Sequence, residues 1–265
     1  MTAHLILIDA LNLIRRIYAV QERPFLLNNE LAENTQQQVL FNTDKACGLA
    51  LSKIIEQQQP SHALAVFDSV KPCWRYAIYP DYKKGRKKMP EHLANKLLDI
   101  QDSFMKQQVD SLISDEDEAD DLIATLAIKV ALKGQKVTII STDKCFLSLL
   151  NQNIEVYDYF NRRYLDSHFV KEKFNVKPEQ LLDLWTLTGD NTNKIPGVAG
   201  IGQVTASKLL NEYGSLTAIL NANDLKHSTN EKLNENLEQI ELSKQLLQLK
   251  KDIPLGFNLK DIRVC

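Results

Sequence analysis

The first 160 residues alternate short hydrophobic runs with segments in which hydrophobic residues recur every three or four positions. Runs of strand length predict five buried β-strands: Leu5–Ile8, Ala63–Phe67, Val109–Ile113, Val137–Ile140 and Ile154–Tyr157. Between them, residues 44–57 and 118–133 have helical spacing, and Gly134 stands where a helix-ending glycine is expected. Short buried strands that alternate with helices predict an α/β fold in which helices flank a parallel sheet.

Residues 161–265 have a different pattern, which predicts a mostly helical part. A glycine-rich segment, residues 195–202, separates one expected helix from another over about 205–213. A long amphipathic helix is expected over about 229–249. The chain is therefore expected to form two closely packed parts.

Composition excludes several classes of protein. The hydrophobic fraction of 44% and the charged fraction of 25% are those of a globular protein that dissolves in water. No basic residues precede the first hydrophobic run, as they would in a signal peptide, and no run approaches the roughly 20 residues of a membrane span. The four cysteines lack zinc-binding spacing and are expected to be reduced thiols. We therefore expect a cytoplasmic monomer without membrane contact.

Acidic residues mark the ends of the predicted strands. Asp9, Asp68 and Asp143 follow three of them, and ligands of an open parallel sheet bind at the carboxyl ends of its strands. A fourth group precedes the helix after the third strand: Glu118, Asp120 and Asp121. Each acid alone fits a turn or a helix cap, but so many like charges at one edge repel unless a cation neutralises them. Oxygen ligands suit Mg²⁺ or Mn²⁺, so the pattern predicts metal-dependent phosphodiester hydrolysis.

Residues 71–88 form a basic segment with interleaved aromatic side chains. Seven basic residues and one acidic residue give it a net charge of +6 in a chain whose net charge is −2. Cations and aromatic rings together suit a nucleic-acid single strand, whose phosphates are neutralised and whose bases stack. A solvated basic loop is the alternative. We favour nucleic-acid contact because the segment follows the strand that ends at Asp68.

The segment Ile195-Pro-Gly-Val-Ala-Gly-Ile-Gly202 predicts a helix-hairpin-helix over about residues 181–213. Its glycines permit a tight turn and a close approach of backbone to a partner. Amides at the start of the following helix can hold a phosphate, which is how such a hairpin grips duplex DNA without reading bases. A plain helical turn is the alternative.

These motifs resemble the bacterial 5′ nuclease, or flap endonuclease, family and the 5′→3′ exonuclease domain of DNA polymerase I. In chain order they are Asp9-Ala-Leu-Asn12, Val66-Phe-Asp68, Tyr82-Lys-Lys-Gly-Arg86, Glu118-Ala-Asp-Asp121, Ser141-Thr-Asp-Lys144, Gly189-Asp190 and Pro196-Gly-Val-Ala-Gly-Ile-Gly202. The resemblance covers nearly the whole chain. It implies a PIN-like nuclease core over residues 1–160, an arch at about 71–100, and a helical DNA-binding part over 161–265.

The resemblance also implies roles for individual residues. Asp120 would make the main direct contact with Mg²⁺, in a first metal site completed by Asp9, Asp68, Glu118 and Asp121. Asp143 and Asp190 would belong to a second metal site. Lys83 and Arg86 would be catalytic, and together with Tyr82 they would contact the DNA strand that passes the arch.

In the hairpin, the resemblance implies a K⁺ ion and contacts with duplex DNA. The K⁺ ligands would be backbone oxygens of Leu187, Thr188, Pro196, Val198 and Ile201. The DNA contacts would come from Gly200, Ile201, Gly202, Gln203, Val204 and Thr205.

Two positions depart from the family pattern, because Cys145 and Asn193 stand where active members have aspartate. Cys145 is a poor Mg²⁺ ligand. The first hypothesis is therefore an active Mg²⁺-dependent endonuclease that cuts 5′ flaps at their junction with duplex. The alternative is a structure-specific DNA-binding protein with weak or vestigial nuclease activity. An Asp-nucleophile phosphatase would leave the hairpin and the basic segment unexplained, and a small PIN-like ribonuclease would match the first half alone.

Overall fold

The computed structural model describes residues 3–25, 32–69, 71–113, 116–256 and 258–264. Within them, six strands form one sheet in the order β3-β2-β1-β4-β5-β6. The strands are β1 (His4–Asp9), β2 (His62–Phe67), β3 (Asp110–Ile113), β4 (Lys136–Ile140), β5 (Ile154–Asp158) and β6 (Arg163–Tyr164). The first five run parallel, and all five were predicted. The sheet is nevertheless mixed, because β6 pairs antiparallel with β5. The two exposed residues of β6 gave no hydrophobic pattern from which to predict it.

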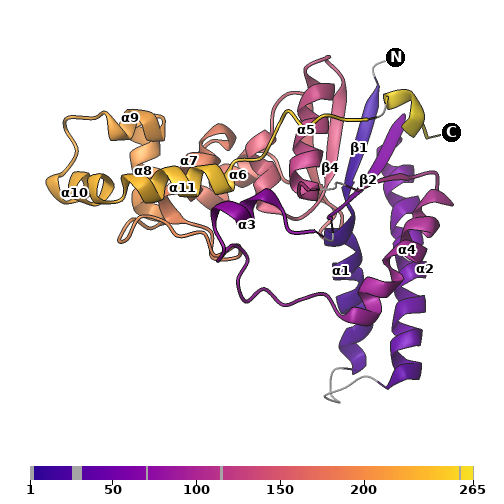
Figure 1. The fold of residues 1–265 in the computed structure, drawn as a ribbon. Helices are drawn as coiled ribbons and strands as arrows, with labels where there is room; N and C mark the ends of the chain where they lie inside the picture. Colours follow the sequence, from indigo (N-terminus) through magenta and orange to yellow (C-terminus); the bar gives the residue numbers. More distant parts are fainter. Residues whose placement is uncertain (1–2, 26–31, 70, 114–115, 257, 265) are drawn as a thin grey trace.

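Helices cover both faces of the sheet (Figure 1). One face packs against α1 (Ala10–Glu22), α2 (Glu33–Gln58) and α4 (Glu91–Met105), and the other against α5 (Ala119–Ala131). The central strand β1 shows why: Leu5 and Leu7 belong to the hydrophobic cluster on the α5 side, whereas Ile6 and Ile8 belong to the cluster on the α1 side. This burial on both faces produces the continuous hydrophobic run of β1 and confirms the predicted α/β class.

The remaining helices lie mainly in the C-terminal part, which extends away from the sheet in Figure 1. They are η1 (Arg23–Phe25), α3 (Trp74–Ile78), η2 (Lys144–Leu149), α6 (Ser167–Phe174), η3 (Pro178–Gln180), α7 (Leu181–Thr188), α8 (Gln203–Tyr213), α9 (Leu216–Leu220), α10 (His227–Glu235), α11 (Leu237–Leu247) and η4 (Leu259–Ile262). The prediction of a single helix over about 229–249 is wrong, because two helices, α10 and α11, occupy this stretch. Asn236 ends α10, and its side-chain amide donates to the carbonyl of Lys232 at 2.7 Å. This local hydrogen bond competes with helix continuation.

After α11 the chain returns along α5 to the sheet (Figure 1). Thr125 Oγ1 donates to the carbonyl of Lys250, and Lys129 Nζ donates to the carbonyl of Ile253. Arg263 then forms a β-bridge with His62 in β2. The C-terminal segment thus contacts both α5 and the sheet.

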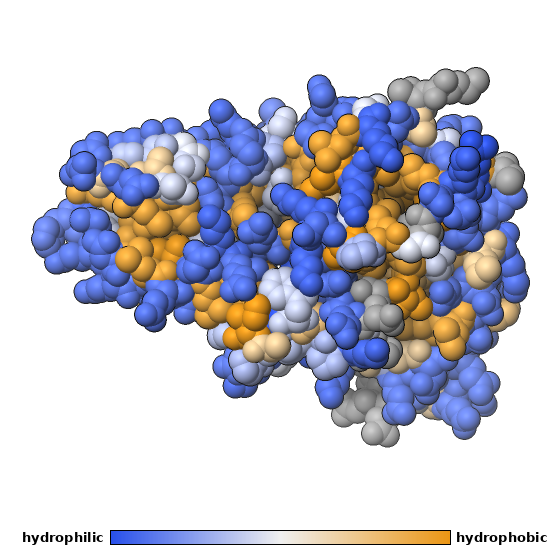
Figure 2. All heavy atoms as spheres, turned by 45° about the horizontal axis from the view of Figure 1, so that its top comes forward, coloured by the Kyte–Doolittle hydropathy of each residue, from blue (hydrophilic) through white to orange (hydrophobic). Residues whose placement is uncertain are grey.

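Hydrophilic side chains cover most of the face shown in Figure 2, with hydrophobic patches among them. Among the described helices, none combines the length and the hydrophobicity needed to cross a membrane.

The turn between α7 and α8 depends on two glycines that touch. A Cβ on Gly197 would lie 2.3 Å from the carbonyl carbon of Thr188, and a Cβ on Gly189 would lie 2.5 Å from the nitrogen of Gly197. Gly189 also has a φ of +75°, which favours glycine. The backbone can therefore close this turn only without side chains at these two positions.

The substitution Gly197→Ala should lower the free energy of unfolding by roughly 1–3 kcal/mol, because its methyl group meets backbone atoms that cannot move aside. Urea denaturation measures the change. Gly48→Ala in α2 is the matched control, since no atom lies within 4 Å of its Cβ. Alanine there should raise stability by roughly 0.5–1 kcal/mol through helix propensity. Equal effects of the two substitutions would contradict the packing argument.

Candidate active site

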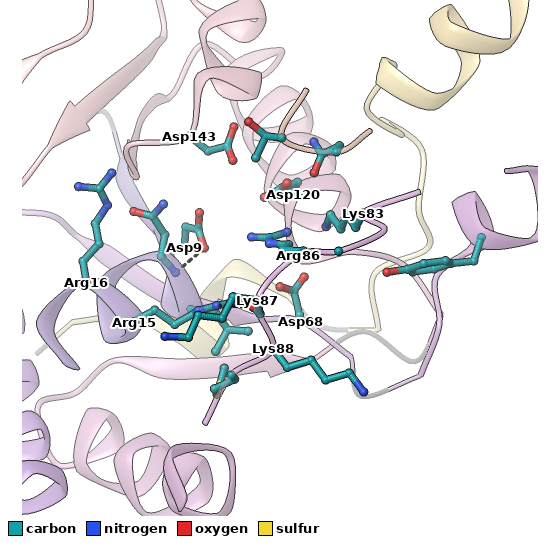
Figure 3. Close-up of a pocket in the computed structure, with 17 residues that line it drawn as sticks. Asp9, Arg15, Arg16, Asp68, Lys83, Arg86, Lys87, Lys88, Asp120 and Asp143 are labelled. Atoms are coloured by element: carbon teal, nitrogen blue, oxygen red, sulfur yellow. Dashed lines mark hydrogen bonds between the residues drawn. The ribbon is translucent and has the colours of Figure 1, made fainter. Parts of the chain in front are cut away.

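The candidate site is a cleft of about 520 Å³ at the carboxyl ends of β1, β2 and β4. Four carboxylates line it, as Figure 3 shows: Asp9, Asp68, Asp120 and Asp143. Cations from α1 and from the segment between α3 and α4 complete the wall: Arg15, Arg16, Lys83, Arg86, Lys87 and Lys88. Carboxylates that can bind a cation and basic side chains that can bind a phosphate therefore line the same cleft.

Ser141 orients two of these carboxylates. Its hydroxyl, at the end of β4, donates to Asp9 Oδ2 at 2.8 Å and accepts from the backbone N–H of Asp143 at 3.0 Å. Asp9 Oδ1 accepts from the N–H of Asn12, which makes Asp9 the N-cap of α1. Asp143 Oδ1 accepts from the N–H of Cys145 in η2. Local caps and one buried hydroxyl thus fix two strand-end acids beside each other.

The other two carboxylates lie at the start of α5. Asp68 Oδ1 accepts from the N–H of Ala119 at 2.8 Å, which joins the end of β2 to the first turn of the helix. Asp120 lies in that turn and accepts no hydrogen bond from any described residue. A carboxylate without a protein partner in this crowded place has its oxygens free for a ligand.

The electrostatics of the cleft favour a cation. Burial raises the pKa of Asp9 to about 7, despite its hydrogen bonds with Ser141 and Asn12. Burial also raises the pKa of Asp120, and the charges of Asp143, Asp9 and Asp68 raise it further. A hard divalent cation would remove this repulsion, and four carboxylates suit Mg²⁺ or Mn²⁺. The residues present therefore fit the metal that the sequence implied.

Glu118 and Asp121 have different neighbours from the other expected metal ligands. The Asp121 carboxylate is fully buried and accepts from Arg75, from Trp74 Nε1 and from the N–H of Lys250. Glu118 accepts from Arg75 at 2.8 Å. Of the five acids implied for the first metal site, Asp9, Asp68 and Asp120 line the cleft. Glu118 and Asp121 instead pair with Arg75 in the basic segment.

All five N–H groups of Arg75 have partners. Two bind Asp121 at 2.7 and 2.9 Å, one binds Glu118, and the remaining two bind the carbonyls of Leu246 and Gln248. Arg75 counted in the sequence only as one of several basic residues. Neither its burial nor its partners, of which two lie far along the chain, produce a local pattern.

The segment expected as the arch, residues 71–100, includes α3 and much of α4. Tyr82 is buried, and its hydroxyl donates to Glu118 at 2.9 Å. Lys83 forms an ion pair with Glu118, and its N–H donates to the carbonyl of Asn193. Arg86 is exposed at the cleft. Arg86 and the three lysines therefore add positive charge to the cleft that the carboxylates line.

Asp190 lies outside the large cleft. It is buried and pairs with Lys144 Nζ at 3.0 Å, and it also accepts from the side-chain amide of Asn193 at 2.9 Å. A smaller cavity of about 40 Å³ lies between Asp190 and the pair Asp143 and Cys145. Lys144 belongs to a motif quoted from the sequence, but its role as the partner of Asp190 was not foreseen.

In the hairpin, the start of α8 is open to a ligand. Gly202, Gln203, Val204 and Thr205 are exposed, whereas the side chain of Ile201 is buried. Gly200 is exposed and has a φ of +76°. Free backbone N–H groups at the first turn of a helix attract anions.

Three of the carbonyls expected to bind K⁺ accept hydrogen bonds within the protein. Their donors are the N–H of Val198 for Leu187, the hydroxyl of Ser243 for Pro196, and the N–H of Ile201 for Val198. The carbonyls of Thr188 and Ile201 lie in the same turn. Leu187 and Thr188 end α7, and the other three residues of this set lie in the loop that follows it.

The sequence reasoning missed Arg15 and Arg16 as site residues. They follow Asp9 by two helical turns of α1, and both line the cleft. The signal was present, since an arginine pair stood just after a strand-end acid. It was overlooked because α1 itself was not predicted.

Two family models match this chain and together cover it almost completely. Residues 4–175 match the 5′-3′ exonuclease N-terminal resolvase-like domain, and residues 176–265 match the 5′-3′ exonuclease C-terminal SAM fold. The fold and the cleft define a nuclease. The chain belongs to the 5′-3′ exonuclease family.

Relatives and solved structures agree with this assignment. The protein named flap endonuclease Xni from Colwellia psychrerythraea is 71% identical, with 100% of this chain and 93% of that protein aligned. The protein of the same name from Photobacterium profundum is 49% identical over 99% and 98%. The T5 D15 flap endonuclease in complex with DNA and metal ions has a TM-score of 0.72 at 22% identity, covering 93% and 89%. The catalytic core of Rad2 with DNA substrate has a TM-score of 0.53 at 13% identity, covering 95% and 80%. These two structures share the fold.

Stability should depend on pH and Mg²⁺ together. Because burial raises the pKa of Asp9 to about 7, the folded protein binds that proton more tightly than the unfolded chain does. This contribution is present at low pH and is lost as the pH rises through about 7. Carboxylates bind a metal ion in their deprotonated form, so we expect Mg²⁺ to raise the melting temperature more at about pH 8 than at about pH 5.5. Thermal melts of the parent and of Asp9→Asn measure this, and an Mg²⁺ effect that is the same at both pH values would contradict it.

Arg75→Met should lower the free energy of unfolding by about 3–5 kcal/mol, because it leaves the buried Asp121 charge without its partner. Adding Asp121→Asn should recover part of that loss. Arg86→Met, which removes an exposed arginine, is the control and should change stability by less than about 0.5 kcal/mol. Urea denaturation distinguishes these cases, and a small effect of Arg75→Met would show that the pair is dispensable.

Proposed function

We propose that this protein is a flap endonuclease that hydrolyses DNA near the junction between a 5′ single-stranded flap and duplex, with Mg²⁺ as cofactor. The cleft carries this proposal, because four carboxylates face six cations in about 520 Å³. Residues 1–160 form the nuclease core, with its arch at about 71–100, and residues 161–265 bind duplex DNA.

Asp120 is the main direct ligand of Mg²⁺, since its carboxylate has no partner among the described residues. Asp68 and Asp143 each hold one oxygen in a local hydrogen bond, Asp9 accepts one bond on each oxygen, and all three line the cleft. These carboxylates would hold Mg²⁺ or Mn²⁺, which would supply a water of lowered pKa and offset charge on the phosphate. Glu118 and Asp121 act on this site indirectly, by fixing the first turn of α5.

Lys83 and Arg86 contact the scissile phosphate. Both line the cleft, where Figure 3 shows them beside Asp120 and Asp68. Their charges stabilise the negative charge that develops on the phosphate as the bond breaks. Tyr82 positions Lys83, because both side chains bind Glu118. The single strand passes along this basic segment.

Duplex DNA binds at the hairpin, away from the cleft. The backbone of residues 200–205 approaches a phosphate, and the exposed first turn of α8 supplies N–H groups. A K⁺ ion held by the carbonyls of Leu187, Thr188, Pro196, Val198 and Ile201 would add positive charge at this point. Such contacts recognise the shape of the duplex and not its sequence.

A second candidate function is structure-specific DNA binding with weak nuclease activity. The pairing of Asp190 with Lys144 favours it, because this carboxylate is already neutralised. Cys145 and Asn193 remove two further carboxylates from the same place. The two candidate functions predict different rates of DNA cleavage but the same DNA ligand.

Purified protein should cut a labelled 5′-flap substrate in Mg²⁺ and K⁺, whereas Asp120→Asn should reduce cleavage to background. Asp99→Asn, an exposed carboxylate on α4, is the matched control and should cut like the parent. Lys83→Met should slow cleavage by roughly a hundredfold. Flap binding measured with Ca²⁺ should survive in all variants. Tight binding without cleavage above the Asp120→Asn background would favour the second candidate, and so would faster cleavage by a Cys145→Asp, Asn193→Asp double variant.

A further inference from the structure

We propose that Asp120, Asp143 and Cys145 form a binding site for a thiophilic divalent cation of the zinc class, and that this cation competes with Mg²⁺ for the two carboxylates. The inhibitory consequence rests on the proposed function, whereas the site itself rests on the geometry of three side chains. Neither the family models nor the names of the relatives describe a site with a cysteine ligand.

The three side chains are spaced for one ion. One ligand atom from each, the Cys145 sulfur and a carboxylate oxygen of Asp120 and of Asp143, lies within 4.8 Å of the others. Donors bound tetrahedrally at about 2.0–2.3 Å from zinc lie about 3.3–3.8 Å apart. The three ligand atoms would therefore have to move about 1 Å closer to one another to bind one ion. Side-chain rotation supplies movements of this size. No backbone rearrangement is required.

Local structure holds two of the ligands in position. Asp143 caps the 3-10 helix η2, and its Oδ1 accepts from the N–H of Cys145 at 2.9 Å. This hydrogen bond keeps the two side chains close together, and the Cys145 thiol also forms a side-chain hydrogen bond with Asp143. Asp120 approaches from the first turn of α5 with both oxygens free of hydrogen bonds from described residues. A cation would thus meet Asp120 without a partner among the described residues, and it would replace the side-chain hydrogen bond between Cys145 and Asp143.

The neighbouring acid does not complete a hard oxygen site. Asp190 is engaged with Lys144 and Asn193 and has little exposure. A fourth position on the ion is therefore left to water or to a substrate oxygen, beside the cavity of about 40 Å³. Three protein ligands and one open position are the arrangement of zinc sites that accept an exogenous ligand.

The cysteine decides which metal binds. Thiolate sulfur favours Zn²⁺, Co²⁺ or Cd²⁺ and is a poor ligand for Mg²⁺, which prefers oxygen. Asp120 and Asp143 line both the large cleft and the small cavity. An ion bound with Cys145 would therefore take two of the four carboxylates that hold Mg²⁺. Zinc should inhibit cleavage by displacing the catalytic metal.

Co²⁺ titration of the purified full chain tests the site without relying on cleavage. Coordination by Cys145 should produce a sulfur-to-cobalt charge-transfer band in the near ultraviolet with one equivalent of Co²⁺. Cys145→Ser should abolish the band, whereas Cys47→Ala, which changes a buried cysteine in α2, should keep it. Circular dichroism checks that each variant is folded. A band that persists in Cys145→Ser, or no band in the parent, would overturn the proposal.

Zinc competition then tests the consequence. In millimolar Mg²⁺, equilibrium dialysis should find one Zn²⁺ per parent chain and at least about tenfold weaker binding by Cys145→Ser. The Zn²⁺ concentration that halves flap cleavage should rise by a similar factor, with each variant compared with its own zinc-free rate. Equal zinc affinity in the two proteins would refute the site. A cobalt band without flap cleavage would refute the proposed function and leave the site intact.

Discussion

The buried guanidinium of Arg75 is the constraint on which the geometry of this protein depends. A charge taken out of water is costly unless its partners replace every lost hydrogen bond, and here all five N–H groups have acceptors. Those acceptors belong to the first turn of α5 and to the end of α11. One side chain therefore joins α3, the helix that carries Asp120 and the C-terminal part. Misplacement of any of the three would leave a buried charge unpaired.

This arrangement explains why acids close together in sequence behave so differently. Asp121 pairs with Arg75, while Asp120, one residue earlier, lines the cleft and has no partner in the described part of the chain. The helix places adjacent side chains about 100° apart, so Asp120 points toward the cleft and Asp121 points toward Arg75. The paired acid holds the helix in position, and the unpaired acid remains available to a ligand. Within one helical turn, one carboxylate therefore stabilises the structure and the next is available to bind a ligand.

Much of the fold could be predicted from the sequence, because burial on both faces leaves continuous hydrophobic runs in β1, β2 and β4. The strand-end acids could also be predicted to share an edge, since parallel strands end together. The partners of Arg75, Lys144 and Glu118 could not be predicted. Each pairing joins segments that lie far apart in the chain or depends on which way a side chain turns, and local patterns carry neither kind of information. The interruption at Asn236 was missed because its amphipathic pattern continues across the break.

The return of the C-terminal segment to β2 has a consequence for how the protein is made. Arg75 needs the carbonyls of Leu246 and Gln248, and Arg263 bridges to His62. A nascent chain emerging from the ribosome therefore carries the complete nuclease half long before its last contacts exist. Domains usually fold in order of synthesis, but this one stays unfinished until translation ends. A chain released before Leu246 is made would lack two of the five acceptors of Arg75.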